Sequence, residues 1–377
     1  MIRLMKKISF PFHKASTARR LVLSLSVIVL TGGAAGESLT PAYASSPPTL
    51  VSSTAASAIT PKTLTLKIDG QSFTLPGGIS KDKTTYVALR PISERLQLKL
   101  GWSQKEQGWT LLGRNTSFTV RTALPSTLRH HYTVNGQSIW GPTPSLVKGS
   151  LYVPLRFLLE SFSYELNALT SGVFTANKLP MNELTVKTKS FHELTRTSEL
   201  DVQYPQIDGF RDRTVQDKLN QYLEARVKEL AAQGRKELAT YQGQYADENL
   251  YFIQYFIKHN QKDRLSIILE SNLFQGAGYA FPTRFPVTFD LKTGEVLTLQ
   301  QVAGNHPSYK AIINKEIKEL FSKKYGPLSK PFESISDDPL FYLHNNMLVV
   351  FFPVLDYTTR FFDYFPEFRF PLSTFQQ

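Results

Sequence analysis

The chain has 377 residues, of which 41% are hydrophobic and 20% are charged, with a formal net charge of +12. This ordinary globular composition excludes a disordered, collagen-like or polytopic membrane protein, and the length allows two or three domains. The sequence contains no cysteine, which excludes disulfides, thiolate metal sites, a cysteine nucleophile and a lipid-modified N-terminal cysteine.

Residues 1–44 have the pattern of a secretory signal peptide. Six basic residues precede or border the apolar run 21–30, and small residues ending in Ala42-Tyr43-Ala44 follow it. A basic region, a short apolar run and an A-x-A site are the parts of such a signal, and the run is shorter than the about 20 residues that cross a bilayer. We therefore predict cleavage after Ala44 and no stable transmembrane span afterwards. An uncleaved anchor is the alternative.

Residues 45–61 are rich in Ser, Thr, Ala and Pro without hydrophobic periodicity, which is typical of a flexible linker. Export of a chain without cysteine fits a Gram-positive envelope best. The sequence thus predicts a secreted or cell-wall-associated protein.

An internal repeat organises the next region. Ile-Asp-Gly-Gln-Ser at 68–72 recurs 66 positions later as Val-Asn-Gly-Gln-Ser at 134–138. At the same offset, Tyr-Val-Ala-Leu-Arg at 86–90 recurs as Tyr-Val-Pro-Leu-Arg at 152–156. Two motifs that share one offset indicate a duplicated module.

Each copy of the repeat predicts the same local structure. Alternating apolar residues around an Asp-Gly or Asn-Gly pair indicate a β-hairpin with a two-residue turn. The Tyr-Val-x-Leu-Arg motif predicts a further strand that leads into a brief helix, over 92–98 in the first copy and 157–162 in the second. Arg90 and Arg156 occupy equivalent positions, so we interpret them as architectural, paired with Glu94 and Glu160 or covering backbone carbonyls.

At these residues the region 62–180 resembles the copper amine oxidase N-terminal-like domain, a repeat of secreted and surface proteins of spore-forming Gram-positive bacteria. The resemblance does not imply oxidase chemistry, which belongs to a separate catalytic domain with copper and a modified tyrosine. The chain has seven histidines and no His-x-His pair, so we expect neither a metal site nor another cofactor.

The pattern changes from about residue 183. A helix with one apolar stripe is expected over 212–233 and a second over 308–324. Strands rich in aromatic and β-branched residues are expected on either side of them, at 191–202, 250–257, 265–274, 285–291, 341–343, 347–352 and 368–372. The fold class is therefore α+β: a duplicated β-rich module with short helices, then an α+β domain of two long helices on an antiparallel sheet.

The second region, 185–377, resembles the extracellular part of the anti-sigma-V factor and the related non-catalytic domain of a peptidoglycan deacetylase. The resemblance is carried by the Tyr-Pro-x-Ile-x-Gly turn at 204–209, the run 289–299 and the closing Phe-x-Phe-Pro-Leu strand. In the anti-sigma factor this part is a receptor for lysozyme, which implies lysozyme as a partner. The chain lacks the cytoplasmic sigma-binding segment, which argues against sigma-factor control. The loop 276–279 reads Gly-Ala-Gly-Tyr where relatives often carry a histidine, and Tyr279 in it is a candidate binding residue.

Charge and aromatic residues suggest how such a protein would bind. Residues 45–182 carry 14 basic and 6 acidic residues, whereas 183–377 carry 23 and 24. A basic module on an exported protein is attracted to an anionic cell-wall polymer or glycan, although a solvated surface without a partner explains the charge equally well. Because the sequence predicts export, we do not expect nucleic acid as a partner.

In the C-terminal part, the irregular stretch 357–365 alternates poorly. Tyr357, Arg360, Phe361 and Tyr364 are therefore candidate binding residues for a glycan or protein, with core packing as the alternative reading.

No catalytic signature is found. Ser80-Lys81-Asp82-Lys83 matches the Ser-x-x-Lys nucleophile motif, but its companion motifs are absent. The sequence does not show whether two carboxylates are paired for glycoside hydrolysis, because such pairs come together only in the fold. The first hypothesis is a non-enzymatic envelope protein that binds a protein or glycan. The second is a cell-wall-modifying hydrolase or deacetylase with an unrecognised site in 183–377, and the third is a spacer without a specific ligand.

Overall fold

The computed structural model describes residues 59–124, 130–168, 173–240, 249–275, 278–279, 282–358 and 365–376. The predicted signal peptide with Ala42 and Ala44, and the linker up to residue 58, lie outside these ranges. Contacts group Ser45–Gln377 into one compact unit. In the described residues the fold is mixed α and β but mostly β, with four sheets.

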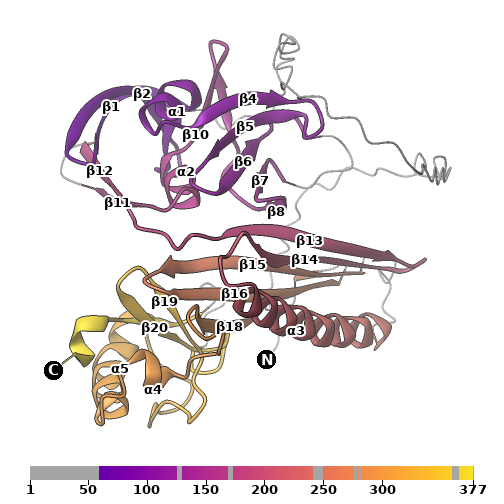
Figure 1. The fold of residues 1–377 in the computed structure, drawn as a ribbon, viewed down its shortest axis with the longest axis vertical. Coiled ribbons are helices and arrows are strands. Elements are labelled where there is room, and N and C mark those ends of the chain that lie inside the picture. The colour runs from indigo at the N-terminus through magenta and orange to yellow at the C-terminus, as the bar shows by residue number, and fades with distance from the viewer. Residues whose placement is uncertain are drawn as a thin grey trace, which may run out of the picture. The chain divides into compact units, whose positions relative to one another are not determined.

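The duplicated module contains two of the four sheets (Figure 1). The first has the strand order β11-β12-β1-β2-β3-β10-β9, and the second the order β4-β5-β6-β7-β8. The strands of the first sheet are β1 (Ile59–Ile68), β2 (Gln71–Ser80), β3 (Thr85–Ala88), β9 (Ser145–Val147), β10 (Ser150–Pro154), β11 (Tyr164–Ala168) and β12 (Val173–Lys178). Those of the second are β4 (Lys99–Ser103), β5 (Gly108–Gly113), β6 (Thr116–Val120), β7 (Tyr132–Val134) and β8 (Gln137–Ile139).

The two repeats exchange strands. The hairpin β11–β12 of the second repeat pairs with β1 of the first, while β4–β5 of the first repeat joins β7–β8 of the second through β6. Strands β3 and β10 pair antiparallel with Val87 opposite Val153, which are equivalent residues of the two repeats. The module therefore has a local twofold axis at this pair, and neither repeat completes its own sheet.

A proline-rich interruption explains why there are two sheets. In the first repeat β2 runs unbroken from the hairpin turn to its pairing with β3. The equivalent stretch of the second repeat contains Trp140-Gly-Pro-Thr-Pro144 and is split into β8 and β9. Pro76 inside β2 is equivalent to Pro142, so the proline that distinguishes the second repeat is Pro144, which has no backbone N–H to donate to a ladder. The hairpin β7–β8 can therefore leave the first sheet and join the second.

The predicted turns of the repeats are present. Asp69 and Gly70 have φ of 46° and 86°, and Asn135 and Gly136 have 52° and 88°, as a type I′ hairpin turn requires. The helices begin earlier than expected, at α1 (Leu89–Arg95) and α2 (Leu155–Ser161). The Leu-Arg pair of each motif is thus the first turn of a helix, and the buried leucines and isoleucine of both helices share one core.

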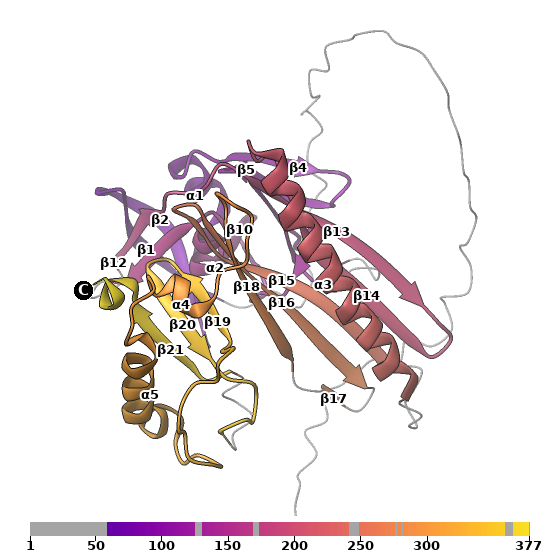
Figure 2. The same cartoon turned by 60° about the horizontal axis from the view of Figure 1, so that its bottom comes forward.

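The third sheet has the order β13-β14-β15-β16-β17, with β18 also paired to β16. Its strands are β13 (Thr185–Leu194), β14 (Ser198–Asp208), β15 (Asn249–Gln261), β16 (Arg264–Gln275), β17 (Gly278–Tyr279) and β18 (Thr283–Asp290). Helix α3 (Arg213–Thr240) lies along one face of this sheet (Figures 1 and 2). Its buried stripe, which includes Leu219, Leu223, Val227 and Leu230, packs on the strands in a second core.

The expectation of two long helices on one antiparallel sheet is corrected in two ways. Strands β14 and β15 are parallel, because α3 connects them and returns the chain to the starting edge. The second long helix, α5 (Tyr309–Tyr325), packs on a different sheet, β19-β20-β21. That sheet is built from β19 (Phe341–His344), β20 (Met347–Phe351) and β21 (Glu367–Pro371), with α4 (Leu299–Val302) and the 3-10 helix η3 (Leu372–Phe375) beside it.

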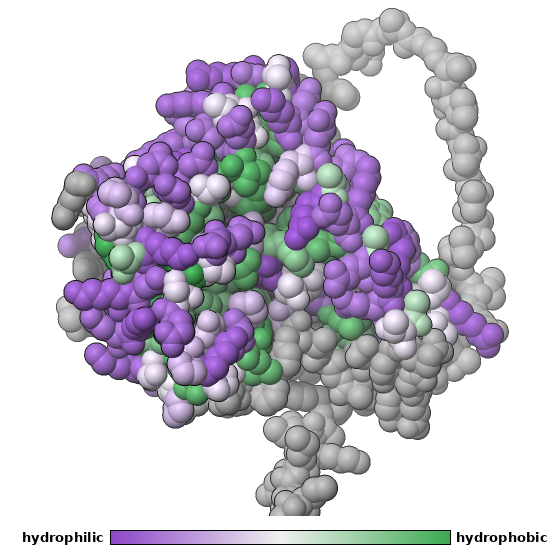
Figure 3. Space-filling view, turned by 90° about the horizontal axis from the view of Figure 1, so that it is seen from below, coloured by the Kyte–Doolittle hydropathy of each residue, from purple (hydrophilic) through white to green (hydrophobic). Residues whose placement is uncertain are grey.

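Apolar contacts join the third and fourth sheets. Ile268 of β16 is buried together with Tyr342, Val349 and Phe351 of the fourth sheet. The space-filling view shows hydrophilic residues over most of the coloured surface, with apolar residues between them (Figure 3). Across the described ranges, none of the helices has the length and apolarity that a membrane span requires.

Candidate functional site

The β15–β16 hairpin carries an irregularity that places basic side chains together. The pairing register shifts between Ile257 and His259, so that Lys258 is the extra residue of a β-bulge. A bulge redirects the side chains that follow it and is frequent beside functional sites. The strands end in a turn at Lys262 and Asp263, which have φ of 52° and 55°.

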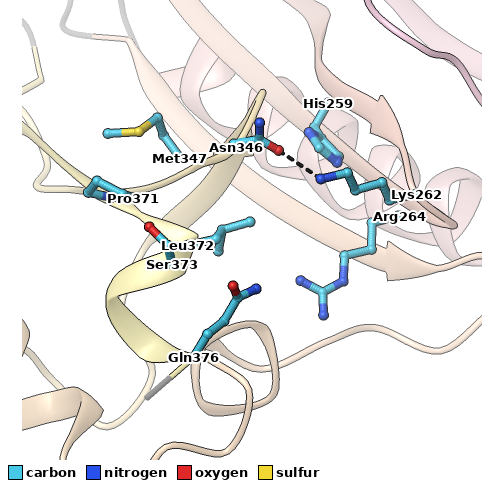
Figure 4. Close-up of a pocket in the computed structure, with 9 residues that line it drawn as sticks. All are labelled: His259, Lys262, Arg264, Asn346, Met347, Pro371, Leu372, Ser373 and Gln376. Atoms are coloured by element: carbon cyan, nitrogen blue, oxygen red, sulfur yellow. Dashed lines mark hydrogen bonds between the residues drawn. The ribbon is translucent and has the colours of Figure 1, made fainter.

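The end of this hairpin forms one wall of a cavity of about 480 Å³. His259, Lys262 and Arg264 extend from the hairpin toward the turn and the helix that carry Asn346 and Gln376 (Figure 4). The remaining lining comes from β20, β21 and η3, through Met347, Pro371, Leu372 and Ser373. The volume lies within the range of small-molecule sites.

The lining of this cavity is cationic. The Nζ of Lys262 donates a hydrogen bond of 3.0 Å to Oδ1 of Asn346, and no carboxylate side chain is among the lining residues that the structure describes. Within the described residues, the guanidinium of Arg264 has neither an ion pair nor a hydrogen bond. A planar guanidinium in that condition retains all its donors for a carboxylate or phosphate.

His259 is an uncharged member of the cavity wall. Its side chain is buried, at 4% exposure, and its Nε2 lies 3.1 Å from the carbonyl oxygen of Gln261. Because a carbonyl only accepts, Nε2 carries the proton and Nδ1 is an acceptor; within the described residues, Nδ1 has no partner. Burial lowers the pKa of His259 to about 4, and the positive charges of Arg264 and Lys262 act in the same direction.

A second charged cluster lies where the third and fourth sheets meet. Nε of Arg284 donates to Glu270 at 2.8 Å, and its Nη1 lies 3.4 Å from Glu367. The hydroxyl of Tyr342 donates to the same Glu367 carboxylate at 2.9 Å, and the Arg284 guanidinium stacks on Phe365 at 4.0 Å. Both carboxylates therefore pair with Arg284 in a partly buried setting, and Glu367 also lies 3.4 Å from Arg369.

The predicted repeat residues lie on α1 and α2. Nη1 of Arg156 contacts Glu160 at 3.2 Å and also donates to the carbonyl of Leu166 at 3.3 Å. The guanidinium of Arg90 instead lies 5.9 Å from the ring centre of Trp109. Glu94 is exposed on the same helix. The structure thus brings Arg156 and Glu160 together, and places Arg90 against an aromatic ring of the neighbouring sheet.

Of the predicted C-terminal binding residues, Tyr357 is described and does not line the cavity. The ring of Tyr357 packs on Phe321, Phe332 and Phe352 with centroids 5.1–5.8 Å apart, and Lys330 covers it at 4.5 Å. This half-buried ring packs against the core of the fourth sheet, and its role in binding stays a prediction. Arg360, Phe361 and Tyr364 lie outside the described residues. Tyr279 is in β17, and its side chain is not described.

The cavity residues were not among those that the sequence singled out. The strands expected at 250–257 and 265–274 leave His259 and Lys262 between them, whereas β15 continues to Gln261. A signal was present: Lys258, His259, Lys262 and Arg264 fall within seven positions of a region that is otherwise nearly neutral. Asn346, by contrast, comes from a distant turn that only the fold brings to the hairpin. In the described part of the chain, no three His, Asp or Glu side chains converge to hold a metal.

A comparison with known protein families finds a match within the repeat module. Residues 67–170 match the family model described as copper amine oxidase N-terminal domain, which confirms the corresponding resemblance over that range. The chain matches no curated protein sequence.

Solved structures similar to the chain include a DUF3298 family protein of Bacteroides fragilis, with 14% identity and a TM-score of 0.37 over 52% of this chain and 92% of the other. Another is a DUF3298 family protein of Pseudomonas aeruginosa, with 16% identity and a TM-score of 0.34 over 52% and 93%. By sequence, then, the chain is similar to copper amine oxidase N-terminal domains over residues 67–170.

Proposed function

We propose that this chain is an exported, non-enzymatic binding protein of the bacterial cell envelope that holds an anionic wall polymer or glycan. The observation that carries the proposal is the cavity beside the β15–β16 hairpin, whose described lining includes Lys262 and Arg264 and no carboxylate side chain. Export, cleavage after Ala44 and a place at the cell wall are part of the proposal, and they rest on the sequence pattern of residues 1–44.

The chemistry of the cavity suits an acidic saccharide unit. The free guanidinium of Arg264 fits a carboxylate or phosphate group, since charged donors make the stronger hydrogen bonds. Met347 and Leu372 supply apolar surface for the face of a sugar ring, and Ser373 and Gln376 supply polar groups for hydroxyls. A few polar groups in a mostly apolar hollow are typical of a ligand site.

Binding is favoured over turnover by the arrangement of the carboxylates. An acid and base pair for glycoside hydrolysis needs two carboxyl groups that are free to face the scissile bond. Glu270 and Glu367 are both held by Arg284, and neither lines the cavity at His259. The hydrolase or deacetylase alternative therefore has no support from this cluster.

The resemblance of 185–377 to the anti-sigma-V factor makes lysozyme a further candidate partner. Lysozyme is a cationic protein, so a cationic cavity opposes it electrostatically, and such binding would need local complementarity elsewhere. We therefore place the anionic polymer first.

The test is retention of the mature chain, residues 45–377, on purified Gram-positive cell wall before and after extraction of its phosphodiester-linked polymers. We expect binding to the intact wall that salt weakens, and an affinity about tenfold lower for Arg264→Gln, because a charge-assisted contact contributes on the order of 1.5–3 kcal/mol. Arg196→Gln, on an exposed turn residue far along the chain, is the matched control and should bind as the parent does.

Three outcomes would contradict the proposal: equal binding to intact and extracted wall, no effect of Arg264→Gln, or release of acetate or reducing sugar from the wall by the chain. Capture of lysozyme that Arg264→Gln leaves unchanged would replace the polymer with a protein partner.

A further inference from the structure

The local twofold axis of the repeats makes two equivalent hairpin turns, and only one of them is covered. At the Asn135–Gly136 turn, the backbone N–H of Thr188 in β13 donates to the carbonyl of Asn135 at 3.0 Å. A Cβ placed on Gly136 would lie 3.5 Å from the side chain of Thr188. At Gly70, the equivalent position, a Cβ would have nothing within 4 Å.

The open turn borders a cavity of about 350 Å³. The cavity lies between the Asp69–Gly70 turn, the end of α1, the β5–β6 turn and the end of β12. Its lining contains three cations, Arg95, Arg114 and Lys178, and one carboxylate, Asp69. Its charge is therefore positive.

The two arginines of this cavity are held in place without being neutralised. Arg95 stacks on Phe73 at 5.0 Å, and Arg114 stacks on Tyr164 at 4.9 Å. Arg114 also donates to the carbonyls of Ser163 and Leu179. Neither guanidinium forms an ion pair within the described residues. The one carboxylate, on Asp69, already accepts a hydrogen bond of 3.1 Å from the backbone N–H of Lys178.

The positive charge is not required by the repeat fold. At the offset of 66, the position of Arg95 is occupied by Ser161, and the position of Lys178 corresponds to Leu112. The turn residue Asp69 corresponds to Asn135, whose Oδ1 accepts from the backbone N–H of Ser117 at 2.9 Å in the same manner. The covered turn thus folds without these charges, and the open turn carries them.

We propose that this cavity at the open repeat turn is a binding site for a phosphodiester group of a soluble anionic polymer. The cations line a hollow, which a slender polymer chain can enter. A bilayer surface is a poorer fit, because interfacial binding needs exposed apolar side chains beside the cations, and the exposed Leu112, Leu124 and Trp140 do not line this cavity. The inference depends on the proposed function in one respect only, namely that the polymer comes from the cell wall.

The experiment is a calorimetric titration of the mature chain with a glycerol phosphate oligomer at two salt concentrations. The double variant Arg95→Gln/Lys178→Gln should lower the affinity about tenfold or more and flatten its salt dependence, because two of the phosphate contacts are removed. Asp69→Asn should raise the affinity several-fold. It removes the opposing charge and keeps a side chain that the equivalent turn already accommodates, so a gain cannot come from misfolding.

The titrations are made in an Arg264→Gln background, so that the cavity beside the β15–β16 hairpin does not contribute to the signal. Lys148→Gln, at an exposed turn of the repeat module outside the cavity at the open repeat turn, is the control and should leave oligomer binding unchanged. The inference is overturned if the double variant binds the oligomer as the parent does, if Asp69→Asn gives no gain, or if the charges affect binding to phosphatidylglycerol vesicles alone. If the chain is not retained on the wall while the double variant and Asp69→Asn still change oligomer binding as expected, that result would contradict the proposed function and support this site.

Discussion

His259 shows how one buried residue couples the candidate site to pH. An imidazole in this setting is kept neutral because burial and the neighbouring cations, Lys262 and Arg264, both oppose its protonation. His344 lies in the same region, and burial lowers its pKa as well. Both histidines should therefore make the fold less stable in acid.

The first prediction concerns this acid sensitivity. The folded pKa of His259, about 4, lies below its ordinary value of 6.5, so the unfolded chain binds more protons between these values. Its contribution is complete above pH 6.5 and is lost as the pH falls toward 4, by about 3 kcal/mol for this group. We expect urea unfolding of His259→Gln to show a smaller loss of stability over this window than the parent.

Arg196→Gln is the control, since Arg196 is exposed on the connection between β13 and β14. This variant should keep the parent's dependence on pH between 4 and 6.5. A parent protein whose unfolding free energy is flat across that interval would contradict the argument.

At the scale of elements, the local sequence predicts that helix α3 exists, and the strands it packs on explain a residue inside it. The apolar stripe of α3 indicates a helix over 212–233, and the helix extends to Thr240. Gly234 lies inside that helix, where glycine is normally unfavourable by about 1 kcal/mol relative to alanine. The reason for the glycine is tertiary, because the ring of Tyr251 on β15 occupies the space that a side chain would need.

The second prediction follows from that contact. A Cβ on Gly234 would lie 2.5–2.9 Å from ring atoms of Tyr251, and relieving such overlap costs about 1–3 kcal/mol. We therefore expect Gly234→Ala to lower the free energy of unfolding, despite the gain in helix propensity. Lys236→Ala, on an exposed position of the same helix, should change it by less than about 0.5 kcal/mol. A more stable Gly234→Ala protein would refute the packing argument.

At the scale of the whole molecule, strand exchange makes the repeat module a single unit. Its core draws buried residues from both repeats, among them Leu64, Val87, Val153 and Leu166. β12 of the second repeat is parallel to β1 of the first, so the sheet cannot lose one repeat and keep its order. A duplicated sequence does not, in this case, give two independent domains.

The third prediction tests whether the two repeats open together. In native-state hydrogen exchange, the backbone amides of β1 and β12 should open with free energies that agree within about 1 kcal/mol, since their protection depends on the same pairing. The amides of β5 and β6, which link the repeats in the second sheet, should follow a common opening as well. Loss of β11–β12 protection at a much lower free energy than that of β1–β2 would show that the repeats open separately.

The sequence by itself determined features whose causes are local. The repeat, its Asp-Gly and Asn-Gly turns and the long amphipathic helix follow from side-chain size, periodicity and positive φ, which neighbouring residues fix. The expected strand 250–257 ends before His259, whereas β15 continues through a β-bulge to Gln261, because a bulge has no local signature. The packing of Tyr357 was left open because strand residues show only which faces alternate.

Only the tertiary structure decided which strands the repeats exchange, which sheet each long helix covers and where the cations converge. Lys262 and Asn346 are 84 positions apart, and the open turn draws Arg95, Arg114 and Lys178 from three different elements. Such convergence depends on the pairing of distant strands and the burial of a shared core. Those are properties of the whole chain, which no short segment encodes.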